Sequence, residues 1–166
     1  LKKHTFEMIK YHPDNMYIHF ENRWLFLSDS TYRSNAIAEL EAKVAEGHQT
    51  PDIHWTLAEI YSTGAVPAHD GTPEGRAKCL KWYGLPDDAV LVTDVHPELV
   101  AKTLRHFGRA IELANDRRDP FHVGLYSQQA AKFLIKANEP AEALDVCRDA
   151  LQRLRTLKTK RDETQM

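Results

Sequence analysis

Residues 130–151 decide the expected fold, and they read AAKFLIKANEPAEALDVCRDAL. The first part has the apolar spacing of a helix, and a turn at Asn138-Glu139-Pro140 separates it from a second helical stretch. Small residues recur on both stretches, at Ala130, Ala131, Ala143, Cys147 and Ala150. Because small side chains let two helix backbones approach closely, this pattern predicts a pair of packed antiparallel helices.

The same pattern returns earlier in the chain. Leu57-Ala58-Glu59-Ile60-Tyr61 stands ahead of a turn at Gly64. Near the start, His12-Pro13-Asp14-Asn15 separates one short helical stretch from a new apolar-periodic one. Between residues 16 and 47 the pattern is weakest, and there only Ala36-Ile37 and Leu40 keep their places. This recurrence predicts an all-α chain built from repeated helical hairpins.

These segments resemble the tetratricopeptide repeat family, whose unit is two antiparallel helices over about 34 residues. Leu57, Ala58 and Tyr61 match the first helix of the family's unit, whereas Trp24 stands where a small residue is expected. The resemblance covers most of the chain through degenerate motifs. It implies one domain over residues 1–166, folded as a right-handed stack of hairpins.

The helices are expected at residues 2–11, 15–28, 33–46, 52–63, 73–83, 96–116, 121–137 and 140–157. Two starts are marked by Pro51-Asp52 and Pro97-Glu98, since proline and acidic side chains favour the first turn. Gly47 and Gly64 are expected to end helices. The short apolar run 89–92 is too isolated for a sheet, so we expect a loop there.

Residues 65–95 contain the densest cluster of glycines and prolines, so we interpret them as an insertion between the two helices of one hairpin. The insertion carries enough apolar side chains that we expect it to fold back on the scaffold with its own short helix, shaping one end of a groove. A competing frame resembles the Sel1-like repeats, in which Gly64 leads to the pair Trp82-Tyr83 on a true repeat helix. The spacing is several residues too long for that frame, which ranks second.

Composition limits the function classes. Twenty-two basic and 24 acidic residues give a formal net charge of -2, which argues against a general nucleic-acid surface. No apolar run approaches the roughly 20 residues of a membrane helix, so no membrane insertion is expected. Leu1 begins inside a helix-like segment. We therefore expect a piece of a longer protein, with the cytoplasm as the default location and any signal sequence missing upstream of Leu1.

No catalytic, cofactor or metal motif stands out, and we predict a protein that is not an enzyme and carries no cofactor or metal. The nine histidines are scattered, and His69-Asp70 is interpreted as a local hydrogen bond within a turn. Cys79 and Cys147 have no cysteine or histidine at metal-binding spacing, so both are expected to be buried small hydrophobic residues.

In the family, the first helices of successive units line a concave groove. Matching this chain to that pattern places Trp55 and Glu59 one helical turn apart on the inward face, with Glu21, Gln128 and Lys132 from the neighbouring units. The acidic residues stand where the family's known carboxylate clamp uses cations. The resemblance therefore implies a groove with an aromatic anchor and mixed charge.

We expect the chain to be a scaffold for protein–protein interaction, binding a partner peptide or protein through this groove and through the insertion. The insertion residues expected to contact the partner are Trp82, Tyr83 and Leu85. Two alternatives stay open, namely an accessory or regulatory domain of a larger enzyme and a self-associating repeat module that forms a homo-oligomer. The fold alone does not distinguish them.

Overall fold

The structure is a computed structural model that describes residues 7, 11, 12 and 23–164. Most of the expected helix at 2–11, most of the one at 15–28 and the predicted site residue Glu21 lie outside the described residues. Within them the chain forms seven helices and no strand, which confirms the all-α class. The helices are α3 (Arg23–Ser28), α4 (Ser30–Ala45), α5 (Pro51–Ala65), α6 (Pro73–Tyr83), α7 (Pro97–Asp116), α8 (Pro120–Lys136) and α9 (Pro140–Thr164).

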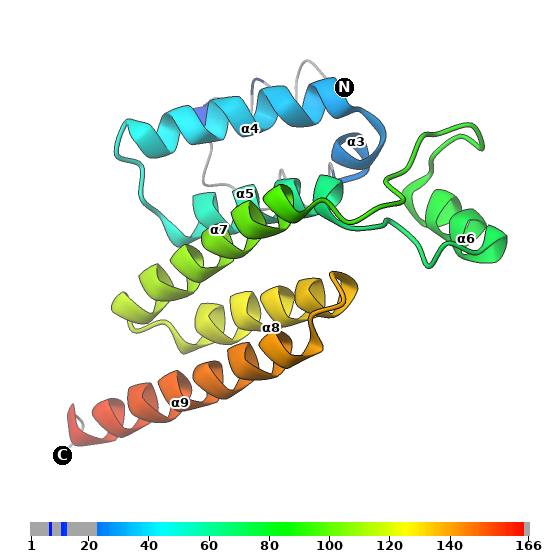
Figure 1. Ribbon diagram of the computed structural model, residues 1–166. Coiled ribbons are helices and arrows are strands. Elements are labelled where there is room, and N and C mark those ends of the chain that lie inside the picture. The colour runs from blue at the N-terminus through cyan, green and yellow to red at the C-terminus, as the bar shows by residue number, and fades with distance from the viewer. Residues whose placement is uncertain (1–6, 8–10, 13–22, 165–166) are drawn as a thin grey trace.

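Apart from α6, the long helices lie side by side in chain order, from α4 through α5, α7 and α8 to α9 (Figure 1). The two most extensive contacts join α5 to α7 and α8 to α9, and α7 in turn lies beside α8. On the other side α4 and the short α3 pack against α5. As a result α5 is enclosed, with thirteen of its fifteen residues buried. A helix that is buried on nearly all sides acts as the central element of its domain.

Two hydrophobic clusters meet on α5. One joins α5 to α7 and α8 through Trp55, Ala58, Phe107 and Tyr126, among others. The second joins α5 to α3 and α4, with Leu25, Phe26, Leu40, Ile53, Leu57 and Ile60 among its members. Because α5 belongs to both clusters, it holds the two halves of the packed helices together.

Most helix starts have the local chemistry that the sequence indicates. Thr50 accepts a hydrogen bond from the backbone N–H of Ile53 ahead of Pro51, and Asp119 accepts one from His122 ahead of Pro120. Pro97 begins α7 as predicted. At the end of α4, Gly47 has a φ of 98°, a left-handed conformation that favours glycine, so the predicted stop is confirmed.

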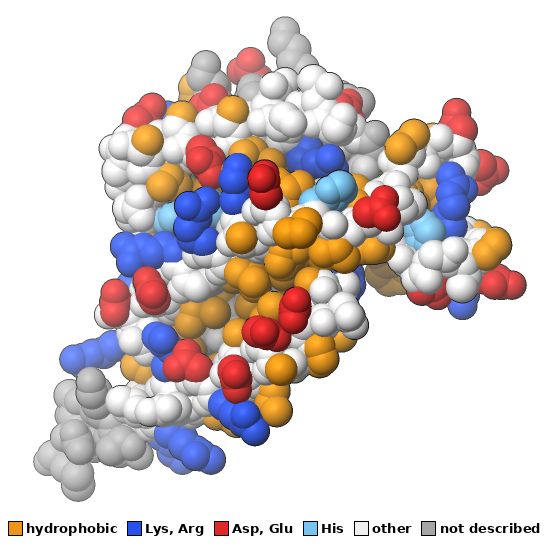
Figure 2. Space-filling view, in the orientation of Figure 1, with side chains coloured by type: hydrophobic (Ala, Val, Ile, Leu, Met, Phe, Trp, Pro, Cys, Tyr) orange, Lys and Arg blue, Asp and Glu red, His pale blue; other side chains and the backbone are white. Residues whose placement is uncertain are grey.

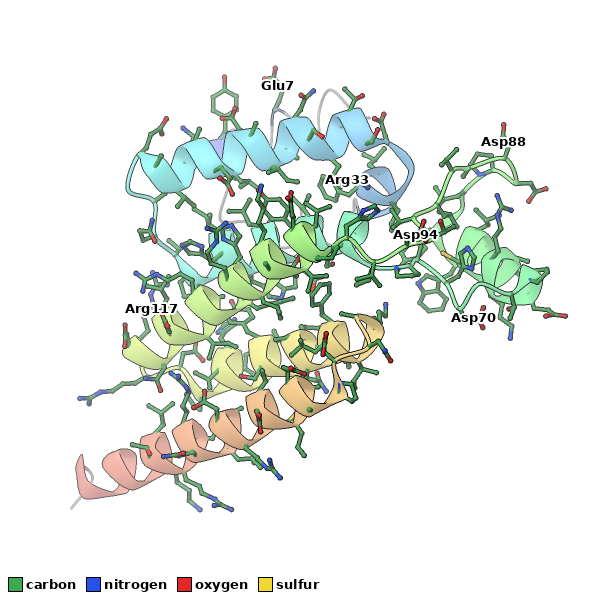
Figure 3. The ribbon with its side chains drawn as sticks, in the orientation of Figure 1. Glu7, Arg33, Asp70, Asp88, Asp94 and Arg117 are labelled. Atoms are coloured by element: carbon green, nitrogen blue, oxygen red, sulfur yellow. The ribbon has the colours of Figure 1, made fainter. Side chains whose placement is uncertain are left out.

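Gly64 has a different role from the predicted one. The helix α5 continues through it to Ala65, so the prediction that Gly64 ends a helix is wrong. Arg33 reaches from α4 toward this position (Figure 3), and a Cβ on Gly64 would lie 3.2 Å from the Arg33 Cζ. The Arg33 guanidinium also donates to the Phe26 carbonyl at 2.8 Å. Glycine at 64 therefore allows a cation to pack directly on the helix backbone.

Residues 67–95 form a lobe that projects from the packed helices beside the end of α5 (Figure 1), and Figure 2 shows the same projection in space-filling form. The lobe contains α6 and has its own small cluster of Cys79, Leu80, Leu85 and Leu91. The expected short helix is confirmed, but the expectation that the apolar side chains fold back on the scaffold is wrong for this cluster, because they pack on one another. The run 89–92 is a loop, as predicted.

The lobe joins the packed helices at a narrow neck. The Ala68 N–H donates to the Val92 carbonyl at 3.0 Å, and the His96 N–H donates to the Ala65 carbonyl at 2.8 Å. These two bonds bring the chain back to its point of departure between α5 and α7. The packing of those two helices therefore does not depend on the length of the lobe.

Two further expectations concern the cysteines and a membrane helix. Cys147 is exposed on α9, so the prediction that both cysteines are buried holds only for Cys79. Among the described helices, none combines the length and the apolar character that crossing a bilayer requires.

Candidate functional site

A pocket of about 130 Å³ lies between the C-terminal halves of α5 and α8. Apolar side chains from several elements contribute to its walls, namely Leu27, Val66, Tyr83, Phe107 and Phe133. Polar side chains from the two helices join them, namely Glu59, Ser62, Thr63, Gln129, Lys132 and Lys136. We call this pocket and its lining the α5–α8 groove.

Helical geometry explains how the two sides of the groove are built. The α5 side presents residues 59, 62, 63 and 66, and the α8 side presents residues 129, 132, 133 and 136. The α8 set follows the spacing i, i+3, i+4, i+7 along one face of that helix. On α5 the residues 59, 62 and 63 follow i, i+3, i+4, and Val66 lies just beyond the helix end with an extended backbone. The pocket therefore receives Phe133 from the face of α8 and Val66 from the residue after α5, with polar side chains of both helices around them.

The structure brings two of the predicted groove residues together, since Glu59 and Lys132 line the same pocket from opposite helices. Gln128 is exposed and does not line it, and its neighbour Gln129 does. Trp55 cannot be an exposed aromatic anchor, because its side chain is only 4% exposed. Its ring packs on Tyr126 with 6.2 Å between centroids, inside the α5–α7–α8 cluster.

The lobe contributes a second, open hollow of about 360 Å³. Trp82, Tyr83, Ala68 and Cys79 give it apolar lining, and the polar residues around them are His69, Asp70, Gly75 and Lys78. The Trp82 side chain is 84% exposed. Leu85 is 8% exposed and packs within the lobe's own cluster, so little of its side chain is open to a partner.

Tyr83 and Ala68 line both hollows, so the lobe adjoins the α5–α8 groove. This agrees with the expectation that the insertion shapes one end of a groove. Phe133, Lys136 and Ala68 were not among the residues predicted from the sequence. The helical spacing from Lys132 points to Lys136, whereas the contribution of Ala68 depends on the path of the neck.

Among the described residues, a buried histidine pair forms a second cluster of titratable groups. His54 Nδ1 on α5 lies 3.0 Å from His106 Nδ1 on α7, and the rings stack at 5.3 Å between centroids. His54 Nε2 lies 2.9 Å from Gln49 Oε1. His106 Nε2 lies 3.4 Å from Glu41 Oε1, which also accepts the Tyr61 hydroxyl at 2.9 Å.

The electrostatics of this pair are those of a buried structural link. Burial, together with the nearby His106 and Arg109, lowers the pKa of His54 to about 4. Burial also lowers the pKa of His106, which Glu41 opposes. Burial, together with the hydrogen bond to Glu41, raises the pKa of Tyr61. With His54 and His106 4% and 7% exposed, neither ring can reach a substrate in solution.

Other side chains with catalytic potential are engaged locally. The Gly71 N–H donates to His69 Nδ1 at 3.1 Å, so the interpretation of His69-Asp70 as a hydrogen-bonded turn is confirmed. In the described ranges, no three histidine, cysteine, aspartate or glutamate side chains gather in a way that could hold a metal ion.

Comparisons of the chain with protein-family models, with curated proteins and with solved structures find no match. The resemblance to tetratricopeptide repeats therefore rests on the quoted residues.

Proposed function

We propose that this chain is an interaction domain that binds an extended peptide segment of a partner protein in the α5–α8 groove. The observation that carries the proposal is the pair of facing helix surfaces, which line one pocket with both apolar and polar side chains. A cavity of about 130 Å³ is below the roughly 300–1,000 Å³ of small-molecule sites, and it suits a single inserted side chain. Amides, hydroxyls and charges at the rim can bind the polar parts of a peptide.

We further infer that α5 with α7 and α8 with α9 are successive units of a tetratricopeptide-like stack. Three features support this inference. The packing is most extensive within these two pairs, α7 links them, and the lobe leaves between the two helices of one pair. In such a stack α5 and α8 are the first helices of their units, which are the ones that line the groove in that family.

A selection from a phage-displayed library of random 12-residue peptides tests the proposed function. Selected peptides are synthesised with a fluorescent label, and their affinity is measured by fluorescence polarisation. Gln129→Trp places an indole at the pocket, so it should weaken binding by about tenfold, as expected for the loss of one anchor. Gln128→Trp adds the same side chain one position away, outside the pocket, and should leave the affinity unchanged.

Equal affinities for the two variants would show that the α5–α8 groove is not the binding site. Failure to select any peptide above the level of an unrelated helical protein would overturn the proposal as a whole.

A further inference from the structure

We propose that the partner segment seats a tyrosine in the α5–α8 groove, with its ring against the aromatic side chains of the pocket and its hydroxyl between the two helices. This inference rests on the proposed function and defines the side chain that the pocket takes.

Three aromatic rings from three different elements line the pocket. Tyr83 comes from the lobe, Phe107 from α7 and Phe133 from α8. Phe107 and Phe133 already pack on each other in a tilted arrangement, with 6.2 Å between ring centroids. Tilted contacts at this separation are favourable for aromatic rings, so a ligand ring can extend the same cluster. The pocket of about 130 Å³ takes one such side chain.

The hydroxyl groups on the α5 side act toward a ligand only as hydrogen-bond acceptors. Ser62 Oγ donates its proton to the Glu59 carbonyl at 2.7 Å, and Thr63 Oγ1 donates to the Ile60 carbonyl at 2.7 Å. A hydroxyl has one proton and two lone pairs, so each oxygen keeps only lone pairs for a further bond. The partial negative charge on these oxygens therefore complements an O–H or N–H donor on the ligand.

The α8 side of the pocket contributes donors. The Lys132 ammonium has N–H groups and no acceptor, and the Gln129 amide has both kinds of group. A phenol hydroxyl donates one proton and accepts on its oxygen, so it can bond to both sides of the pocket at once. Phenylalanine and leucine offer neither side a hydrogen bond, and indole only donates. The match depends on the polarity of the hydrogen bonds, so the partner segment needs no particular net charge.

Ser62 is the α5 hydroxyl that we expect the phenol to meet. Its bond to the Glu59 carbonyl lies in a partly buried position, whereas the bond of Thr63 is buried. Ser62 is therefore the acceptor closer to the opening of the pocket.

The experiment starts from the library selection and the fluorescence-polarisation assay described above, with the full chain. Peptides whose binding Gln129→Trp weakens are ligands of the α5–α8 groove, and we expect tyrosine to recur at one position among them. Replacing this tyrosine with phenylalanine removes only the hydroxyl and should weaken binding to the parent by about tenfold. Replacing it with leucine should weaken binding further, because the ring contacts are lost as well.

Ser62→Ala removes the proposed acceptor from the protein. This variant should bind the tyrosine peptide about tenfold more weakly than the parent does, and it should bind the tyrosine and phenylalanine peptides equally, as expected for two groups that act through one bond. Ser34→Ala is the matched control, since it removes an exposed hydroxyl from α4 and should keep the preference for tyrosine. Thermal melts check the fold of both variants.

The comparison of tyrosine and phenylalanine peptides on the parent decides the role of the phenol without any protein variant. Equal affinities there, or groove ligands anchored by leucine, phenylalanine or tryptophan, would overturn this inference while the proposed function stands. A preference for tyrosine that Ser62→Ala retains in full would overturn the assignment of Ser62 as its acceptor. If no selected peptide depends on the groove, the proposed function itself fails.

Discussion

At the scale of single residues, His54 and His106 give the clearest dependence on pH. Burial holds His54 neutral in the folded protein, with a pKa of about 4 against about 6.5 in an unfolded chain. Between these two values the unfolded chain binds a proton that the folded protein does not. The contribution of His54 to the free energy of unfolding is therefore fully present above pH 6.5. It falls as the pH is lowered toward 4, and this group causes no further loss below that value.

We predict that acidification from pH 7 to pH 4 reduces the free energy of unfolding by about 3 kcal/mol through His54. Urea unfolding at pH 7, 5.5 and 4 measures this change. His54→Gln keeps a polar side chain that does not titrate, so it should remove most of the dependence on pH. His48→Gln changes an exposed histidine and serves as the control. It should retain the parent's dependence of stability on pH. If the free energy of unfolding changed equally with pH in the two variants, the prediction would be contradicted.

The residue scale also shows what the sequence could not specify. The resemblance to tetratricopeptide repeats grouped Glu59 with Lys132, which line one pocket, and the face on which each lies follows from the period of its helix. It could not determine whether that face looks toward solvent or core. Trp55 lies one turn before Glu59, where α8 covers the helix, so Tyr126 packs on its ring. The exposure of each turn depends on a neighbour that is 60 or more residues away in the sequence.

At the scale of elements, the contact between α8 and α9 depends on small side chains. Ala143 is buried in a cluster with Ala131 and Leu134, close to the start of α9. We predict that Ala143→Leu overpacks this contact and costs about 1–3 kcal/mol. Thermal unfolding followed by circular dichroism measures the loss. Ala141→Leu adds the same side chain at an exposed position of the same helix and should melt within about 2 °C of the parent.

Most helices could be predicted because their signals are local. The period of the apolar residues, together with the prolines at the helix starts, predicted α5 to α9. Their ends are correct to within a few residues, except that α9 extends further at its C-terminal end than predicted. Gly64 failed as a stop because its role is tertiary, since the Arg33 guanidinium occupies the space of a side chain. A glycine needed for a close approach has the same sequence signature as a glycine that ends a helix.

At the scale of the whole molecule, the lobe is separable from the packed helices. We predict that replacing residues 69–91 with a short Gly-Ser linker leaves the remaining helices folded. Ala65 and Val66 stay in place because they belong to the core cluster. Circular dichroism should show a cooperative melt with a midpoint close to that of the parent, and the affinity for library-selected peptides should fall because Tyr83 no longer lines the α5–α8 groove. Loss of the cooperative melt would show that α6 is part of the core, as the Sel1-like frame requires.

The candidate site could be predicted only in part, because it is assembled from segments far apart in the chain. The sequence indicated one wall on α5, one on α8 and an insertion nearby. It could not place Tyr83 and Ala68 between the two hollows, since their position depends on the path of the chain through the neck. It also could not show that the lobe buries Leu85 in a cluster of its own.

The neck has a consequence for how this protein can diverge. The chain leaves α5 and returns to α7 at adjacent points, held by backbone hydrogen bonds that are independent of side-chain identity. We therefore expect insertions, deletions and substitutions beyond the neck to leave the helix contacts unchanged. Such a region can accumulate mutations under weak purifying selection for stability, so related chains can acquire new specificities while keeping the same scaffold.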